Sequence, residues 1–406
     1  MAEAQSKQHL LYLDGLRAVA ALFVVVHHTV LQFFDFDMHG LKGPGRAFVK
    51  FFWEGHLAVD LFIVLSGFCL MMPVVSSQYI LKGGILKFYK KRAYRILPPY
   101  YIATVLSLLL IAFFIGNKTH THWDASIPVT YKDVILHLLL IHDLFFNHAF
   151  TINHSFWSVS VESRIYIFFP LLVWLWSKYG SKTAVVVSVI ISALLFLIGY
   201  YIHSFKPNYS INLSGVNPYI ILFSFGMLAA DLSFSDKKIF VEKFKVVFSI
   251  LFMLSVIVFL IVRKPPEALA KPYGDIRLLI SDIAFGLGCA LLLINLNSVN
   301  NKTIPFKGIY LFLQTRLMVF LGTFAYSIYL IHAPFVQLLT LVLFKLNIHN
   351  RVIATIILST AGPVVIVAIS YLFFLLFERP FMKLKRPQKD QINQAEEITP
   401  ANNSLA

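Results

Sequence analysis

The stretch "LDGLRAVAALFVVVHH", residues 13–28, places an arginine and two histidines in a segment that is otherwise typical of a membrane span. A charged group in hydrocarbon is costly, so such residues usually face a cavity or a partner. His28 follows Arg17 by eleven residues, which is roughly 16 Å along a helix and nearly the same helical face, whereas His27 points about 100° away. An arginine binds anions, and histidine is a natural general base near neutral pH. The alternatives are a snorkelling arginine and a packing histidine.

A second basic motif, "FYKKRAYRILPPYY", contains Arg92 and Arg95. Residues three apart share a helix face, and a pair of guanidinium groups is a good clamp for phosphate. The competing interpretation is simple positive charge on the cytoplasmic side of a membrane. The alignment of Arg17 with His28 favours the phosphate clamp.

The motif "HSFWSVSVESRIYIFFP" contains Glu162 inside a predicted helix, at a depth comparable to that of His28. A carboxylate there could orient the imidazole and stabilise its charged form, as in a histidine–acid pair. The alternative is that Glu162 forms a structural pair with Arg164 or another buried base. The residues alone leave both interpretations of Glu162 open.

Other polar residues in apolar runs favour structural interpretations. In "HLAVDLFIVLSGFCL", Asp60 could pair with His56 or a basic group, and Gly67 permits a close helix contact. His332, in "LGTFAYSIYLIHAPF", could be structural or line a binding site. Eleven of the fourteen histidines precede residue 155, so the polar chemistry is concentrated in the first half of the chain.

The composition defines the class of protein. The 406 residues are 58% hydrophobic and only 14% charged, with a mean hydropathy of +0.73. These values and the recurring long apolar runs predict an all-α, polytopic membrane protein rather than a soluble one. The net charge of +15 lies mainly in short loops, which is typical of membrane orientation and does not indicate nucleic acid binding. The two cysteines, Cys69 and Cys289, show no disulfide or zinc spacing, so no metal is expected.

About ten transmembrane helices are predicted. The segment 132–146, which holds His137, His142 and Asp143, is expected not to cross. The basic loop 76–96 and the basic tail after Phe377 place both termini in the cytoplasm. Residues 1–385 form the predicted transmembrane domain, and residues 386–406 a disordered cytoplasmic tail. The predicted spans are residues 13–34, 56–75, 97–116, 157–177, 183–203, 217–231, 244–262, 277–297, 318–342 and 353–377.

Six motifs in this order resemble acyltransferase family 3, over residues 10–385. Members of this family are integral membrane enzymes that acylate sugars of lipopolysaccharide, peptidoglycan, exopolysaccharide and some secondary metabolites. The motifs are "LDGLRAVAALFVVVHH", "VDLFIVLSGF", "KRAYRILPPYY", "FWSVSVESRIY", "LGTFAYSIYLIHAPF" and "FERPF". Some relatives carry an appended hydrolase-like domain, which is not expected in this chain.

The resemblance assigns roles to particular residues. It implies that Arg17 and His28 are essential, and it matches the family's later motifs to Arg92, Arg95, Trp157, Ser158 and Glu162. The sequence departs from the family pattern at Ser163 and Arg164, where a polar and often acidic pair is common, and at Ala325, where serine is usual. None of these departures affects the expected base.

The expected function is transfer of an acyl group from cytoplasmic acyl-CoA, most simply acetyl-CoA, to a hydroxyl of an extracytoplasmic or lipid-linked sugar. Arg17, Arg92 and Arg95 would bind the donor, and His28 supported by Glu162 would remove the hydroxyl proton. Ser66, Trp157, Ser158 and His332 are the predicted substrate-binding residues. Direct transfer and a covalent intermediate on Ser66, Ser158 or Cys69 both remain open, as does the oligomeric state. The expected partners are membrane lipid and a carbohydrate or glycolipid acceptor, in a bacterial cytoplasmic membrane. The alternative is a transporter of a polysaccharide or lipid-linked sugar.

Overall fold

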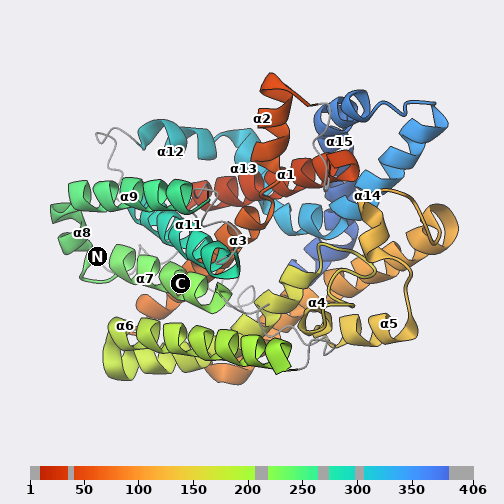
Figure 1. Cartoon of the computed structure of the whole chain (residues 1–406). Coiled ribbons are helices and arrows are strands. Elements are labelled where there is room, and N and C mark those ends of the chain that lie inside the picture. Colours follow the sequence, from red (N-terminus) through yellow and green to blue (C-terminus); the bar gives the residue numbers. More distant parts are fainter. Residues whose placement is uncertain (1–9, 35–40, 206–217, 264–273, 298–305, 384–406) are drawn as a thin grey trace, which may run out of the picture.

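Figure 1 shows a computed structural model of the chain, in which residues 10–34, 41–205, 218–263, 274–297 and 306–383 are described. The regular elements within these ranges are helices. The predicted tail 386–406 lies outside the described residues. Eight helical stretches are long and apolar enough to cross a membrane, which confirms the predicted polytopic helical bundle. These are Leu11–Phe34, Gly43–Val75, Gly84–Ile115, Trp157–Gly199, Lys245–Val262, Arg277–Asn297, Ala325–Lys345 and Arg351–Met382.

The predicted spans 157–177 and 183–203 form the two arms of one long element, α6. Gly180 separates the arms with φ of 85° and ψ of 170°, a backbone conformation that glycine adopts without strain. The shorter α7, Tyr219–Phe234, corresponds to the predicted span 217–231. The eight stretches, with α6 divided at Gly180 and α7 added, account for the ten predicted spans.

The helix bounds agree with the prediction in most places. The helices are α1 (Leu11–Phe34), α2 (Gly43–Phe52), α3 (His56–Val75), α4 (Gly84–Leu110), α5 (Tyr131–Leu138), α6 (Trp157–Phe205), α7 (Tyr219–Phe234), α8 (Lys238–Lys243), α9 (Lys245–Arg263), α11 (Gly274–Asn297), α12 (Lys307–Leu313), α13 (Arg316–Thr323), α14 (Ala325–Lys345), α15 (Arg351–Phe373) and α16 (Arg379–Lys383).

Two predicted starts are wrong. The span predicted from residue 318 is interrupted at Phe324, so that α13 is separate and the long helix α14 begins at Ala325. Just before this break, a Cβ on Gly322 would lie 2.0 Å from the carbonyl oxygen of Asp14, so α13 is pressed against α1. The span predicted from residue 97 begins instead at Gly84, since the basic segment before Pro98 is also helical.

The segment 132–146 contains only an eight-residue helix and a short turn. The helix α5 is capped by Thr130, whose hydroxyl bonds to the backbone of Asp133 while the Asp133 carboxylate bonds back. A 3₁₀ turn follows at His142–Leu144. Neither is long enough to cross a bilayer, as predicted.

The helix α3 lies at the centre of the bundle and packs against α1, α7 and α11. A Cβ on Gly67 would lie 2.1 Å from the carbonyl oxygen of Phe223, and one on Gly226 would lie 2.0 Å from that of Val64. The backbones of α3 and α7 therefore touch, which confirms the structural interpretation of Gly67. Figure 1 shows both arms of α6 along one edge of the bundle and α5 beside α4.

The orientation can be tested by labelling single cysteines with a membrane-impermeant maleimide in intact cells. A cysteine at the exposed Tyr131 should react from outside, whereas a cysteine at the exposed Lys87 should react only after lysis. The native cysteines give little background because Cys289 is buried and Cys69 is half-buried. If Lys87→Cys were labelled in intact cells, the predicted cytoplasmic location of this loop would be wrong.

Candidate active site

The three predicted arginines line one cavity, named here the arginine cavity, between α1, α3, α4, α6 and α14. Arg17 donates through Nη1 to Oδ1 of Asp14 at 2.6 Å, and its Nη2 lies 3.0 Å from the Sγ of Cys69. Arg92 and Arg95 form no ion pair within 4.0 Å in the described part of the chain. The carboxyl groups of Glu162 and Glu378 line the same wall, so the arginines lie among opposite charges without a direct ion pair at Arg92 or Arg95.

Ser66, Ser158 and Glu162 line the same arginine cavity. The Oε1 of Glu162 accepts hydrogen bonds from Ser66 Oγ, at 2.6 Å, and from the hydroxyl of Tyr166. The hydroxyl groups of Ser158 and Tyr329 are 2.5 Å apart. A base therefore lies directly beside Ser66, a relation that the sequence did not reveal.

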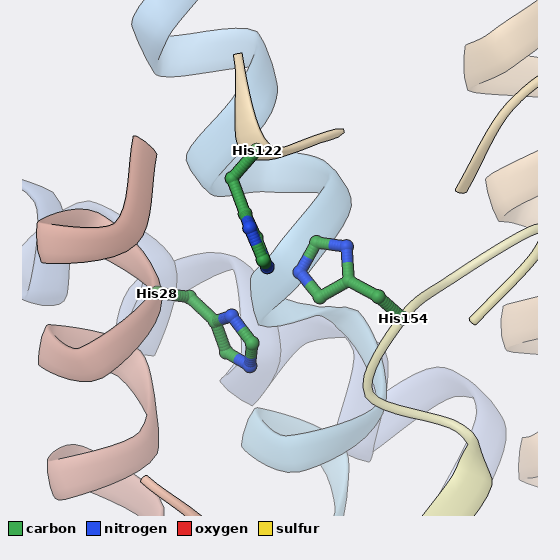
Figure 2. A group of neighbouring side chains, drawn as sticks. All are labelled: His28, His122 and His154. Carbon is green, nitrogen blue, oxygen red and sulfur yellow. The ribbon is translucent and has the colours of Figure 1, made fainter. Parts of the chain in front are cut away.

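The five histidines of the second cavity, named here the histidine cavity, come from four separate parts of the chain. Trp157 also lines this cavity, against the ring of Tyr219 at 5.8 Å. Figure 2 shows that three of the rings converge, from α1, from the turn after Thr121 and from the loop before α6. The histidines are His27, His28, His56, His122 and His154.

The ring of His28 is central to this group. Its centroid lies 4.6 Å from that of His154, 5.9 Å from that of His122 and 5.0 Å from that of His332. The Nδ1 of His28 is buried without a hydrogen-bond partner, as is the Nε2 of His154. Imidazole nitrogens that are buried and unpaired are available to accept a proton or to bind a ligand.

Two neighbouring imidazoles have a defined tautomer. Nδ1 of His27 lies 2.8 Å from the carbonyl oxygen of Phe52, and Nδ1 of His332 lies 2.7 Å from that of Tyr329. Because a carbonyl can only accept, each Nδ1 carries the proton, and in the neutral ring Nε2 bears the lone pair. His332 is fully buried beside the ring of His28 and does not line either cavity.

The predicted pairing of Glu162 with His28 is not formed. The two residues line different cavities, and no hydrogen bond joins them among the described residues. The two residues were predicted to lie at a similar depth in the membrane, but depth along a helix does not say which neighbour a side chain faces. Ser158, Glu162 and Tyr166 are spaced by four, so they share one face of α6, and that face lines the arginine cavity.

The alternative, a structural pair of Glu162 with Arg164, is not formed either, because Arg164 bonds to Asp143. It forms a bidentate ion pair with Asp143, with Nη1 2.6 Å from Oδ1 and Nη2 bonded to Oδ2. This pair ties the end of the 132–146 segment to α6, two residues beyond Glu162. Arg164, at which the sequence departs from the family pattern, thus has a structural role as the partner of Asp143.

Sequence reasoning did not identify His122 and His154. The concentration of histidines before residue 155 was their only signal, because neither lies in a periodic segment. His122 is held by a loop that wraps around Asp124, whose Oδ1 accepts from the backbone and hydroxyl of Thr119 at 2.6 and 2.7 Å. Burial raises the pKa of the Asp124 carboxyl, but the hydrogen bonds from Thr119 and His120 outweigh it and hold this pKa below its usual value.

The two cavities adjoin, because Val59 and Tyr329 line both. Val59 and Ser66 are seven residues apart on one face of α3, which is roughly 10 Å along the helix.

Two groups of side chains could hold a metal ion. Within each group, one ligand atom per residue lies within 4.8 Å of the others. They are His28 with His122 and His154, and His56 with Asp60 and Asp282.

The fold and these cavities define a multi-pass helical membrane protein with a polar site enclosed in its bundle. The chain belongs to acyltransferase family 3: the family's acyltransferase domain matches residues 10–375, which confirms the resemblance seen in the motifs.

The chain is also similar to individual O-acetyltransferases. It is 29% identical over 174 residues to "O-acetyltransferase OatA" of Staphylococcus aureus strain NCTC 8325, covering 41% of this chain and 25% of that protein. It is 26% identical over 202 residues to the "Putative peptidoglycan O-acetyltransferase YrhL" of Bacillus subtilis strain 168, covering 48% of this chain and 28% of that protein. The matches therefore span about a quarter of each relative's length. No solved structure matches the chain significantly.

Breaking the ion pair of Asp143 with Arg164 should destabilise the protein. Their side chains are 3% and 15% exposed, so Asp143→Ala leaves a buried charge uncompensated and should cost about 3–5 kcal/mol in the free energy of unfolding. Unfolding in mixed detergent micelles measures this change. The double variant Asp143→Leu with Arg164→Met should recover most of the loss, whereas Glu242→Ala at an exposed pair should have little effect. If the double variant were as unstable as Asp143→Ala, the loss of stability could not be attributed to an uncompensated charge on Arg164.

Proposed function

We propose that the protein is a membrane O-acyltransferase that moves an acyl group, most simply acetyl, from acyl-CoA to a hydroxyl of a sugar or polysaccharide. One observation carries the proposal: a cavity lined by arginines adjoins a cavity lined by histidines inside one helical bundle. The first cavity suits an anionic donor, and the second suits removal of a proton from a hydroxyl. Membership of the acyltransferase family supports the same reaction.

The donor would bind through the arginine cavity from the cytoplasmic side. Arg92 and Arg95 form no ion pair within 4.0 Å in the described residues, although Glu162 and Glu378 line the same cavity, so both guanidinium groups are suited to the phosphate groups of CoA. Arg17, which already bonds Asp14, would contribute less. The acyl end would extend along α3 past Ser66 and reach the junction at Val59 and Tyr329.

The acceptor would enter the histidine cavity, with Trp157 packing against the sugar. His28 would take the hydroxyl proton while the oxygen attacks the thioester carbon. The new carbon–oxygen bond forms as the carbon–sulfur bond breaks, and the proton passes from the imidazole to the departing thiolate. Glu162 would hold Ser66 and Tyr166 in place rather than orient His28.

The name of one relative supports a proposal for the acceptor class. YrhL is named for peptidoglycan, so we propose a bacterial cell-surface glycan or its lipid-linked precursor as acceptor. The protein would then lie in the cytoplasmic membrane with both termini inside, so that the histidine cavity faces the outer surface.

The alternative, a transporter of a polysaccharide or lipid-linked sugar, also uses buried polar residues that face a cavity. It would not release CoA. Purified protein in detergent, supplied with acetyl-CoA and a peptidoglycan fragment, should release CoA and yield an acetylated fragment. Fragment movement into vesicles without CoA release would favour the transporter instead.

Replacement of the proposed base should affect the chemical step. We expect His28→Ala to reduce kcat by about 10²–10⁴, the usual contribution of general acid–base catalysis. His27→Ala is the matched control, because Nδ1 of His27 is engaged by Phe52 and its loss should leave most activity. Steady-state rates of CoA release measure both. An inactive His27→Ala beside an active His28→Ala would reverse the assignment.

Replacement of the proposed phosphate ligands should affect donor binding. A hydrogen bond to a charged group is worth about 1.5–3 kcal/mol, so Arg92→Ala or Arg95→Ala should raise the KM for acyl-CoA on the order of ten- to a hundredfold with little change in kcat. Arg→Lys should restore only part, since lysine lacks the planar fork. Varying acyl-CoA at saturating acceptor separates the two constants. If the arginine variants kept a normal KM and lost only kcat, Arg92 and Arg95 would not be the phosphate ligands of the donor.

A further inference from the structure

Asp60 is a carboxylate without a partner in the interior of the bundle. It is 0% exposed, and neither of its oxygens has a hydrogen-bond partner. An unpaired charge in such a setting is strongly unfavourable, so a buried carboxyl group is normally protonated, paired or bound to a metal. No basic side chain forms an ion pair with Asp60 in the described residues. The expected pairing with His56 is not formed either.

Two further groups lie beside Asp60. His56 precedes it by four residues, so both lie on one face of α3, and Asp282 approaches from α11, which packs against α3. The Nε2 of His56 is 3.2 Å from Oδ1 of Asp282, and one ligand atom from each of the three residues lies within 4.8 Å of the others. Glu54 adds a third carboxylate, 3.7 Å from Nδ1 of His56.

The charges of this group do not balance when both carboxyl groups are ionised. A protonated His56 would then offset only one of the negative charges on Asp60 and Asp282. The three imidazoles of His28, His122 and His154 present the opposite case, because neutral rings need no counterion. The carboxylate group therefore has the stronger requirement for a cation.

We propose that His56, Asp60 and Asp282 bind a divalent metal ion, most simply Zn²⁺. One imidazole nitrogen and two carboxylate oxygens are a ligand set that zinc accepts at about 2.0–2.2 Å. Neighbouring ligand atoms of a tetrahedral zinc at these distances are about 3.3 Å apart, close to the 3.2 Å between His56 and Asp282. Binding would release the proton shared by these two residues, because each ligand must offer a lone pair.

The ion would connect α3 to α11 and fix the imidazole of His56. The side chain of His56 is 30% exposed and lines the histidine cavity, which gives the ion a route of entry. The metal would thus act as a cross-link between helices and as a positioning element for one wall of that cavity. This role does not depend on the acyl transfer proposed above.

Metal content tests the proposal directly. Tag-free full-length protein in detergent is loaded with ZnCl₂, dialysed against metal-free buffer and analysed by inductively coupled plasma mass spectrometry. We expect about one zinc per chain for the natural sequence and less than about a tenth of that for Asp60→Asn and His56→Ala. Asp231→Asn, at a buried aspartate that Lys237 already pairs, is the matched control and should retain zinc.

Thermal unfolding keeps the test informative if a variant is unstable. The natural protein should unfold at a lower temperature in EDTA than in ZnCl₂, whereas Asp60→Asn should unfold at the same temperature in both. His154→Ala should still bind zinc. The proposal is overturned if the natural protein binds no zinc, if Asp60→Asn retains it, or if His154→Ala loses it, since the ion would then lie on the three imidazoles.

Discussion

The cost of a charged or polar side chain in hydrocarbon is the constraint on which the rest of this structure depends. The chain meets it in two ways. Some groups are paired inside the bundle, as in the ion pair of Arg164 with Asp143 and the bonds of Arg17 to Asp14 and Cys69. Others, such as His28 and His154, line a cavity and keep a ring nitrogen without a hydrogen-bond partner. Unpaired groups of this kind are the ones suited to chemistry.

The separation of the two cavities has a chemical consequence. Guanidinium groups close to an imidazole would disfavour its protonated form, which a general base must adopt during catalysis. The bundle keeps Arg92 and Arg95 in one cavity and His28 in the other, joined only where Val59 and Tyr329 line both. In the proposed reaction, the donor's phosphates and the acceptor's proton would thus be bound in different, adjoining cavities.

Close backbone contacts make this arrangement rigid. The contact of α3 with α7 at Gly67 and Gly226 leaves no room for any side chain, and Gly322 sets α13 against α1 in the same way. Helices that touch by their backbones cannot rotate freely about their axes. The face of α3 that carries Ser66 is consequently fixed with respect to α7, and the face of α1 that carries His28 with respect to α13.

The sequence by itself determined the class of protein, the bounds of α1 and α3, and the shared face of Arg17 and His28, because hydrophobicity and the 3.6-residue period act within one helix. It also carried the family motifs from end to end. Only the tertiary structure decided which face meets which neighbour. It turned Glu162 towards Ser66 rather than His28, paired Arg164 with Asp143, and brought His122 and His154 to the first helix. Helical periodicity fixes direction relative to one axis, whereas contacts between distant segments depend on how the axes pack, which no local pattern encodes.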